Sequence, residues 1–251
     1  MILNTIEMGE GPPLLLLHGL FGSARNWGAI QKQLARRRRV LAMDLRNHGD
    51  SPHAPGMDYA AQARDVAETL AARGAQGTAV VGHSMGGKVA MALALEHSAL
   101  VERLVIADIA PRRYPPALRG YVAAMRSLPL TEGMSRRDAD AALAEGVPVA
   151  GIRAFLLASL DLATEPPRWS LGLAEIAAGM PQIEDFPVAG HYAGPTLVLA
   201  GERSDYIASA DHAAIRRLFP EARFAMVERA GHWLHSDNPQ GFLQEVEHFL
   251  P

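Results

Sequence analysis

Cysteine is absent from this sequence, aromatic residues are scarce, and neither sign of charge is in clear excess. None of the 251 residues is a cysteine, and aromatic residues make up 6% of the chain. A chain without cysteine has no disulfide, no thiolate nucleophile and no thiolate metal ligand. The same absence leaves the redox compartment open, because a cysteine-free chain survives in either environment.

The charge balance and the lack of long apolar runs exclude further classes. The chain has 24 Lys and Arg against 27 Asp and Glu, a formal net charge of −3 that gives no general attraction to nucleic acid or anionic membranes. No apolar run approaches membrane-spanning length, and the first residues, with Glu7 and Glu10, lack the pattern of a signal peptide. We therefore expect a cytoplasmic protein that neither binds nucleic acid nor inserts into a membrane.

Short apolar runs, bounded by Gly, Pro or Asp, alternate with longer helical patterns. Hydrophobic residues make up 49% of the chain, which is enough for a substantial core. The alternation is typical of a parallel sheet with crossover helices, whose strands are buried on both faces. The runs span residues 14–17, 40–43, 78–81, 104–107, 196–199 and 224–227. Polar residues follow each run, and we expect them to converge at the carboxyl-end edge of the sheet, where such sheets bind ligands.

The strand pattern disappears between Arg112 and about Gly190. This stretch predicts helices over residues 118–128, 135–144, 149–160 and 171–180, with Ser135 as a helix cap because Asp138 follows three residues later. An all-helical insertion at this point would lie over the carboxyl-end edge of the sheet. We therefore expect a core of residues 1–111 and 191–251 and a cap of residues 112–190 that forms one structural unit with it. Apolar cap side chains either line a pocket or pack the cap helices together: Met125, Leu128, Phe155, Leu156, Leu160 and Trp169.

The residues Gly82-His83-Ser84-Met85-Gly86 form a G-x-S-x-G motif between an apolar run and a helical pattern. In this context the motif is typical of a nucleophile elbow, where glycines on both sides of the serine make room for a tight turn. Ser84 then projects above the sheet at a helix N-terminus, whose dipole favours a developing oxyanion. Residues 82–88 also begin a phosphate-binding P-loop pattern, but Val89 stands where that motif needs a hydroxyl for magnesium.

Two backbone N–H groups are expected to bind the oxyanion. One belongs to Met85, directly after the nucleophile. The other is assigned to Leu20, because His18-Gly19-Leu20-Phe21-Gly22 follows the first apolar run and its glycines allow close backbone approach. His48, in a turn-rich segment, is interpreted as a hydrogen-bonded loop histidine rather than a catalyst.

The general base should be a histidine on a loop after the last strand. His232 follows a glycine there and suits this role better than His235, which lies farther toward the last helix. The acid has two candidates, Asp108 at the end of one strand and Asp205 on the loop after the next, since either could accept a hydrogen bond from the imidazole Nδ1–H. Ser204 could orient the imidazole or the carboxylate as a hydroxyl partner.

Six segments together resemble the YbfF-type esterase branch of the α/β-hydrolase fold family, over nearly the whole chain. They are His18-Gly19-Leu20-Phe21-Gly22, Asp44-Leu45-Arg46-Asn47-His48-Gly49, Gly82-His83-Ser84-Met85-Gly86-Gly87-Lys88, Asp108-Ile109-Ala110-Pro111, Tyr121-Val122-Ala123-Ala124-Met125-Arg126 and Gly231-His232-Trp233. The resemblance implies an α/β-hydrolase fold with a mostly parallel central sheet flanked by helices, and a helical cap inserted after the sixth strand of that fold. It further implies Ser84 as nucleophile, His232 as base and Asp108 as acid, with Ser204 joining the histidine. Asp205 departs from the pattern of the branch, which typically has no carboxylate directly after that serine. Many other α/β-hydrolases take their acid from this loop, so Asp108 and Asp205 both remain candidates for the acid.

The resulting hypothesis is a serine hydrolase that cleaves carboxylic esters or thioesters of small to medium acyl groups through an acyl-enzyme. It predicts a small-molecule acyl substrate and no metal or organic cofactor, because no spacing of histidines and carboxylates suits a metal. Two alternatives remain open. The same scaffold could hydrolyse lactones or carbon–carbon bonds or carry out perhydrolysis, or the chain could be a non-catalytic module that binds a small acyl-bearing ligand.

Overall fold

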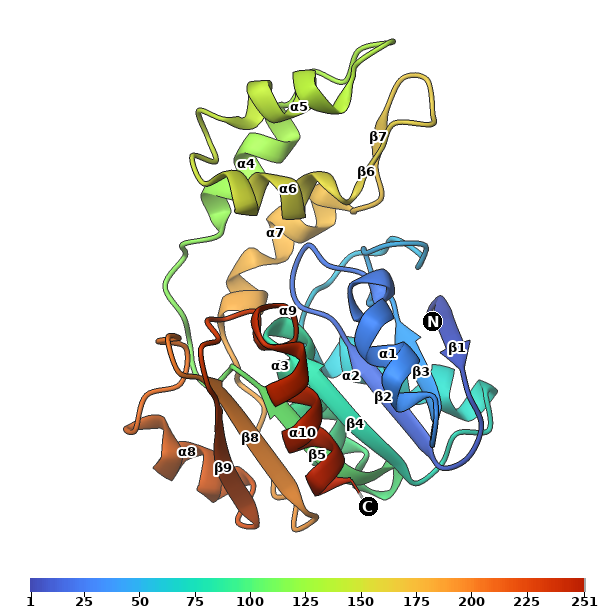
Figure 1. Ribbon diagram of the computed structural model, residues 1–251, viewed down its shortest axis with the longest axis vertical. Coiled ribbons are helices and arrows are strands. Elements are labelled where there is room, and N and C mark those ends of the chain that lie inside the picture. The colour runs from blue at the N-terminus through green and yellow to red at the C-terminus, as the bar shows by residue number, and fades with distance from the viewer. Residues whose placement is uncertain (251) are drawn as a thin grey trace.

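The computed structural model describes residues 1–250 and is built on a seven-stranded sheet with helices on both faces (Figure 1). The strand order is β1-β3-β2-β4-β5-β8-β9, in which β1 runs antiparallel to β3 and every other neighbouring pair is parallel. The strands are β1 (Thr5–Met8), β2 (Pro13–Leu17), β3 (Arg39–Met43), β4 (Thr78–His83), β5 (Val101–Ala107), β8 (Thr196–Gly201) and β9 (Ala222–Val227). Each predicted apolar run lies within one of these strands, which confirms the mostly parallel sheet.

The edge strand β1 is the one element of this sheet that the sequence pattern did not predict. Its sequence, Thr-Ile-Glu-Met, is not a continuous apolar run, and two of its four residues are exposed. A strand at the edge of a sheet is covered less completely than a central one, so its composition gives a weaker signal.

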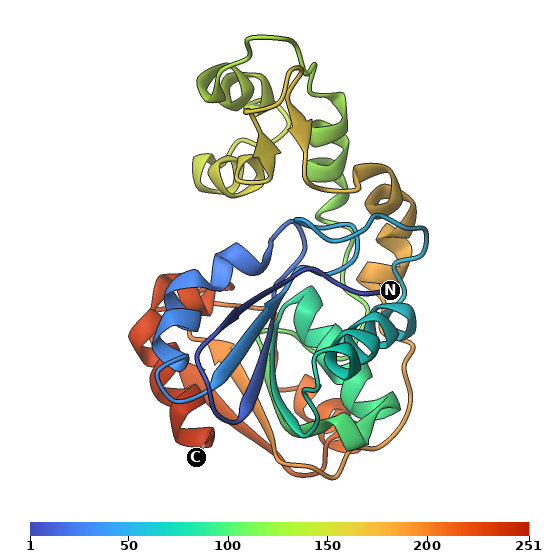
Figure 2. The same cartoon turned by 90° about the vertical axis from the view of Figure 1, so that its right-hand side faces the viewer.

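Alternating side chains of the central strands supply two separate cores. In β2, Leu14 and Leu16 pack on one face of the sheet and Leu15 and Leu17 on the other, and all four are fully buried. One face is covered by α1 (Gly28–Leu34), α9 (Leu234–Asp237) and α10 (Pro239–Phe249), and the other by α2 (Tyr59–Ala72), α3 (Met85–Glu96) and α8 (Asp211–Leu218), as Figure 2 shows from the side. Two short 3-10 helices, η1 (Ala24–Trp27) and η2 (Ser98–Leu100), complete this part of the chain.

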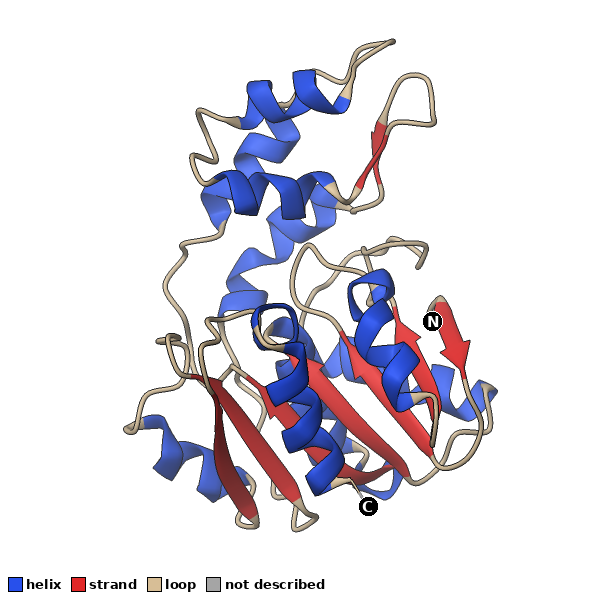
Figure 3. Cartoon of the chain, viewed as in Figure 1, coloured by secondary structure: helices blue, strands red, loops and turns tan. Residues whose placement is uncertain are grey.

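The segment between β5 and β8 rises above the carboxyl ends of the strands and is mostly helical (Figures 1 and 3). Its helices are α4 (Arg119–Ser127), α5 (Arg136–Leu143), α6 (Ala150–Leu157) and α7 (Leu173–Glu184), each overlapping one predicted helix. Ser135 caps α5 as predicted: its side chain accepts a hydrogen bond from the Asp138 backbone N–H.

The expectation of an all-helical insertion is wrong in one detail. Strands β6 (Leu160–Asp161) and β7 (Arg168–Trp169) form a two-stranded antiparallel ribbon between α6 and α7. Strands of two residues are too short to show an alternating pattern, so sequence periodicity does not predict them. None of the helices in residues 1–250 is long and apolar enough to cross a membrane.

Candidate active site

Ser84 occupies the sharp turn between β4 and α3. Its backbone has φ 53° and ψ −120°, a left-handed conformation that is strained for a residue with a side chain. The flanking glycines explain why the turn forms: a Cβ on Gly82 would overlap the backbone of Gly86, and a Cβ on Gly86 would overlap the backbone of Leu17. The turn places the Ser84 hydroxyl at the N-terminus of α3, at the edge where the parallel strands end.

His232 lies on the loop after β9 and faces the Ser84 hydroxyl. Its Nε2 is 3.0 Å from Ser84 Oγ, and its Nδ1 is 2.8 Å from Asp108 Oδ2. The three side chains come from the ends of β4, β5 and β9, far apart in sequence, and the structure brings them into one hydrogen-bonded series. In this arrangement the imidazole can take a proton from the serine while the carboxylate stabilises the positive charge that results.

Asp108, and not Asp205, reaches the imidazole. The Asp108 carboxylate is fully buried and also accepts hydrogen bonds from the Gly201 backbone N–H at 3.1 Å and from the Ser204 hydroxyl. The Ser204 hydroxyl therefore orients the carboxylate, and its hydrogen bond goes to Asp108 rather than to the histidine. Asp205 is exposed and lines the pocket that contains Ser84, but it makes no hydrogen bond to His232.

The backbone N–H groups of Leu20 and Met85 remain free to bind a ligand. Within residues 1–250 neither of them donates a hydrogen bond to another residue. Both residues line the pocket that contains Ser84. Two donors beside the nucleophile can stabilise the negative oxygen of a tetrahedral adduct.

Two buried histidines hold the loop that carries Leu20. His48 Nε2 accepts a hydrogen bond from the Phe21 backbone N–H at 3.3 Å, while its Nδ1 donates to the Arg46 carbonyl at 2.8 Å. His18 makes a similar link, because its Nε2 accepts a hydrogen bond from the Leu45 backbone N–H at 3.0 Å. Burial lowers the pKa of His48 to about 3, so the ring stays neutral and keeps an acceptor nitrogen. His48 is thus a loop histidine that shapes the backbone around Leu20.

Two further residues contact His232, and no sequence pattern signals either contact: Tyr206 lies outside the motifs, and His83 occupies a variable position of G-x-S-x-G. The ring of Tyr206 stacks on the imidazole with the centroids 3.6 Å apart. His83 Nε2 donates a hydrogen bond to the His232 backbone carbonyl at 2.7 Å. His235 does not reach Ser84; it packs against Trp27, and burial lowers its pKa to about 4.

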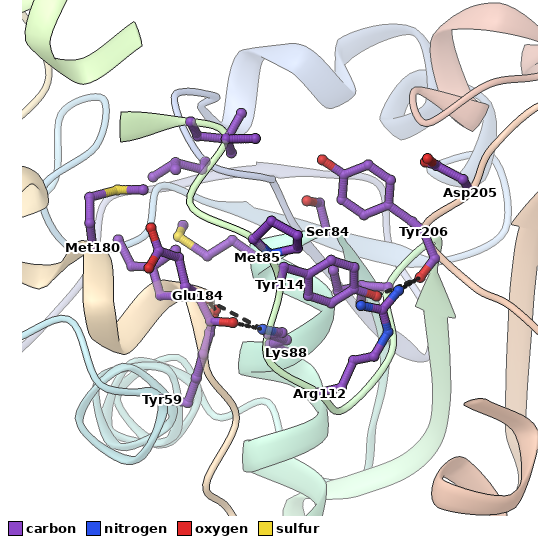
Figure 4. Close-up of a pocket in the computed structure, with 16 residues that line it drawn as sticks. Tyr59, Ser84, Met85, Lys88, Arg112, Tyr114, Met180, Glu184, Asp205 and Tyr206 are labelled. Atoms are coloured by element: carbon purple, nitrogen blue, oxygen red, sulfur yellow. Dashed lines mark hydrogen bonds between the residues drawn. The ribbon is translucent and has the colours of Figure 1, made fainter. Parts of the chain in front are cut away.

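A pocket of about 340 Å³ opens beside Ser84 (Figure 4). Polar groups line it at a few points, among them Lys88, Glu184 and Asp205. Most of its wall is apolar and includes Leu20, Met85, Ile109, Leu118, Met180 and Ile183. A largely apolar cavity next to a nucleophile suits the acyl part of a small substrate.

The cap contributes to this pocket only through its two ends, within residues 112–118 and 180–184. None of the six cap side chains predicted as possible pocket lining takes part, and the packing alternative is the one observed. Met125 and Leu156 are fully buried, and the others pack within the cap or, like Phe155, against Trp233 at a ring distance of 5.4 Å. An apolar helix face looks the same in sequence whether it faces a neighbouring helix or a cavity.

Lys88, one helical turn after Ser84, fixes the end of α7 instead of binding phosphate. Its Nζ donates to the carbonyls of Ile183 and Glu184 at 3.4 and 3.2 Å (Figure 4), and to that of Asp185 at 3.0 Å. A cation is favourable at the C-terminal end of a helix, and burial lowers the pKa of Lys88 to about 7. The helix that begins after the nucleophile is therefore tied directly to the last helix of the cap.

Comparisons with known proteins show what the chain is similar to. A model of the alpha/beta hydrolase family matches residues 14–245. The sn-1-specific diacylglycerol lipase ABHD11 of Mus musculus is 43% identical over 248 residues, which cover 95% of this chain and 81% of the relative. Esterase YbfF of Escherichia coli (strain K12) is 32% identical over 242 residues, which cover 95% of this chain and 92% of the relative. A solved structure of a marine microorganism esterase matches with a TM-score of 0.95 at 33% identity and covers 100% of both chains.

Proposed function

The chain belongs to the alpha/beta hydrolase family, and from its candidate active site we propose a serine hydrolase that cleaves carboxylic esters or thioesters of small to medium acyl groups. The observation that carries the proposal is the series of hydrogen bonds from the Ser84 hydroxyl through His232 to Asp108. The names of its relatives, a lipase and esterases, support hydrolysis of a carboxylic ester.

In the first half of the proposed reaction, Ser84 Oγ attacks the acyl carbonyl carbon while His232 Nε2 takes its proton. Asp108 stabilises the imidazolium through Nδ1 and stays ionised. The Leu20 and Met85 N–H groups bind the oxyanion of the tetrahedral intermediate. The bond from the acyl carbon to the leaving oxygen or sulfur then breaks, and Nε2 gives its proton to the departing alcohol or thiol.

Water completes the reaction by the same steps. His232 Nε2 takes a proton from the water as its oxygen attacks the acyl carbon, and the same two N–H groups hold the second oxyanion. The ester bond to Ser84 Oγ breaks, the proton on Nε2 returns to that oxygen, and the carboxylic acid leaves. The protein begins the next cycle with a neutral histidine.

The acyl group is proposed to occupy the apolar pocket beside Ser84. Its volume of about 340 Å³ is in the lower part of the range of small-molecule sites, which favours small to medium acyl groups. Leu118 and Met180 reach this pocket from opposite ends of residues 112–190. We therefore treat those residues as a cap that works as one structural unit with the core of residues 1–111 and 191–251.

The experiment that tests the proposal is hydrolysis of p-nitrophenyl butyrate by the wild type and by Ser84→Ala, with circular dichroism of both to verify folding. The proposal expects turnover that falls to background in Ser84→Ala. Turnover that persists in the variant would show that Ser84 is not the nucleophile. Parallel assays with a butyryl thioester compare the two leaving atoms on one acyl group.

A further inference from the structure

His83 is a buried histidine for which the proposed reaction has no use. It is the last residue of β4 and the direct neighbour of Ser84, and its side chain is 4% exposed. Its ring centroid lies 4.8 Å from that of His232 and 4.9 Å from that of His235. It reaches no part of the pocket around Ser84. Any effect of the ring on the reaction is therefore exerted through its neighbours.

The contact that distinguishes His83 is its hydrogen bond to the backbone of the base. Its Nε2 lies 2.7 Å from the carbonyl oxygen of His232. A carbonyl oxygen can only accept, so Nε2 carries the proton and donates. Burial keeps the pKa of His83 well below its usual value, so the ring remains neutral and the bond persists through the neutral pH range.

We infer that His83 is a positioning residue that sets the distance between the nucleophile and the base. Residues 83 and 84 share one peptide link, so the backbone that carries Ser84 Oγ also carries the donor that holds the His232 backbone. The rest of that loop is held from other directions: the Ala230 carbonyl accepts from Arg203 N–H at 2.9 Å, and Gly231 N–H donates to Asp237 at 2.7 Å. The hydrogen bond from His83 links the backbone of this loop to the strand that ends at the nucleophile.

The inference rests on the proposed roles of Ser84 and His232, and it predicts a specific kinetic effect. A displacement of a catalytic group by about 1 Å can lower a rate roughly 100-fold. His83→Leu fills a similar space without a donor, so we expect kcat to fall roughly 10- to 100-fold. KM should change less than about threefold, because His83 does not touch the pocket.

Two amide variants serve as a matched pair. The side-chain nitrogen of His83→Gln stands close to the place of imidazole Nε2, whereas that of His83→Asn stands near Nδ1 and falls short of the His232 carbonyl. We expect His83→Gln to recover at least fivefold of the lost kcat over His83→Leu, and His83→Asn to recover none. His235→Leu removes the other buried imidazole without breaking the bond and should keep kcat within about threefold.

The closing experiment measures kcat and KM of these four variants on p-nitrophenyl butyrate, with kcat expressed per site titrated by a phosphonate, so that misfolded protein does not count. Nitrogen-15 NMR of the imidazoles in the wild type supplies a readout that is independent of turnover. We expect the His83 proton on Nε2. A proton on Nδ1, an unchanged kcat in His83→Leu, or equal losses in the Gln and Asn variants would overturn the inference. A wild type without Ser84-dependent turnover would overturn the proposed function as well. Failure of the inference alone is distinct from this, because it leaves Ser84-dependent turnover in the wild type.

Discussion

The ring of Tyr206 lies nearly parallel to the imidazole of His232, with the centroids 3.6 Å apart and the planes inclined by 18°. The backbone of Tyr206 is held in turn, because its carbonyl accepts a hydrogen bond from the Tyr114 hydroxyl at 2.5 Å. The stack covers one face of the imidazole and leaves both ring nitrogens toward Ser84 and Asp108. It therefore restrains rotation of the base, and the aromatic face favours the imidazolium that forms during the reaction.

Removal of the Tyr206 ring should cost turnover, whereas removal of its hydroxyl should not. A contact of this kind contributes about 1 to 1.5 kcal/mol, so Tyr206→Ala should lower kcat roughly 10-fold. Tyr206→Phe keeps the ring and should retain kcat within about threefold. Steady-state kinetics on one p-nitrophenyl ester compares the two, and equal losses would assign the effect to the hydroxyl.

Asp108 and Asp205 should differ sharply when each carboxylate is replaced by an amide. Asp108→Asn removes the charge that stabilises the imidazolium and should lower kcat roughly 1,000- to 10,000-fold. Asp205→Asn changes an exposed group that does not contact His232 and should leave kcat within about threefold. If the kinetics of the two variants are equal or reversed, Asp108 is not the acid.

Turnover should depend on acyl length and on the space around Met180. Each methylene buried in an apolar pocket contributes about 0.8 kcal/mol, so kcat/KM should rise about fourfold per methylene until the pocket is full and then fall. Met180→Trp narrows the pocket and should lower kcat/KM for octanoyl relative to acetyl esters about 10-fold. Met226→Trp, on the exposed side of β9, is the matched control. A flat profile from acetyl to decanoyl would mean that this pocket does not hold the acyl chain.

Acid should destabilise the fold through histidines that are buried in the neutral form. Burial lowers the pKa of His48 to about 3 and that of His235 to about 4, against an ordinary value of 6.5. Between pH 6.5 and 4 the unfolded chain binds protons at these rings and the native chain does not, so the free energy of unfolding falls as pH falls. Each ring contributes up to about 1.4 kcal/mol per pH unit.

His235→Leu provides the test of this pH dependence. The variant lacks one ring that is buried in the neutral form, so its unfolding free energy should decline less steeply between pH 6.5 and 4, by up to about 1.4 kcal/mol per pH unit. Denaturant unfolding of wild type and variant at several pH values measures the two slopes. Identical slopes would contradict the burial of a neutral His235.

Sequence alone predicted the features that depend on local pattern. Continuous apolar runs identified six strands, and the glycines around Ser84 identified the turn, because a bulkier residue at either position would overlap backbone. The edge strand β1 and the ribbon of β6 and β7 were not predicted, because partly exposed or two-residue strands have no continuous apolar run.

The contacts around His232 depend on how distant loops meet, and sequence could not decide them. Asp108 and Asp205 both follow strands, but the carboxylate of Asp108 turns inward toward His232 while that of Asp205 faces solvent. Tyr206 lies outside the recognised motifs, and His83 occupies a variable position of G-x-S-x-G, so the sequence does not indicate that either contacts the base. Their roles follow from three-dimensional packing, which a single sequence records only indirectly.

The central claim is that Ser84 is the nucleophile that forms the acyl-enzyme. The most direct test is intact-protein mass spectrometry after treatment with a fluorophosphonate, followed by peptide mapping of the adduct. The account predicts one phosphonate per chain, attached to Ser84, absent from Ser84→Ala and formed in step with the loss of esterase activity. An adduct on another residue, or full inhibition of the wild type with Ser84 unmodified, would contradict it.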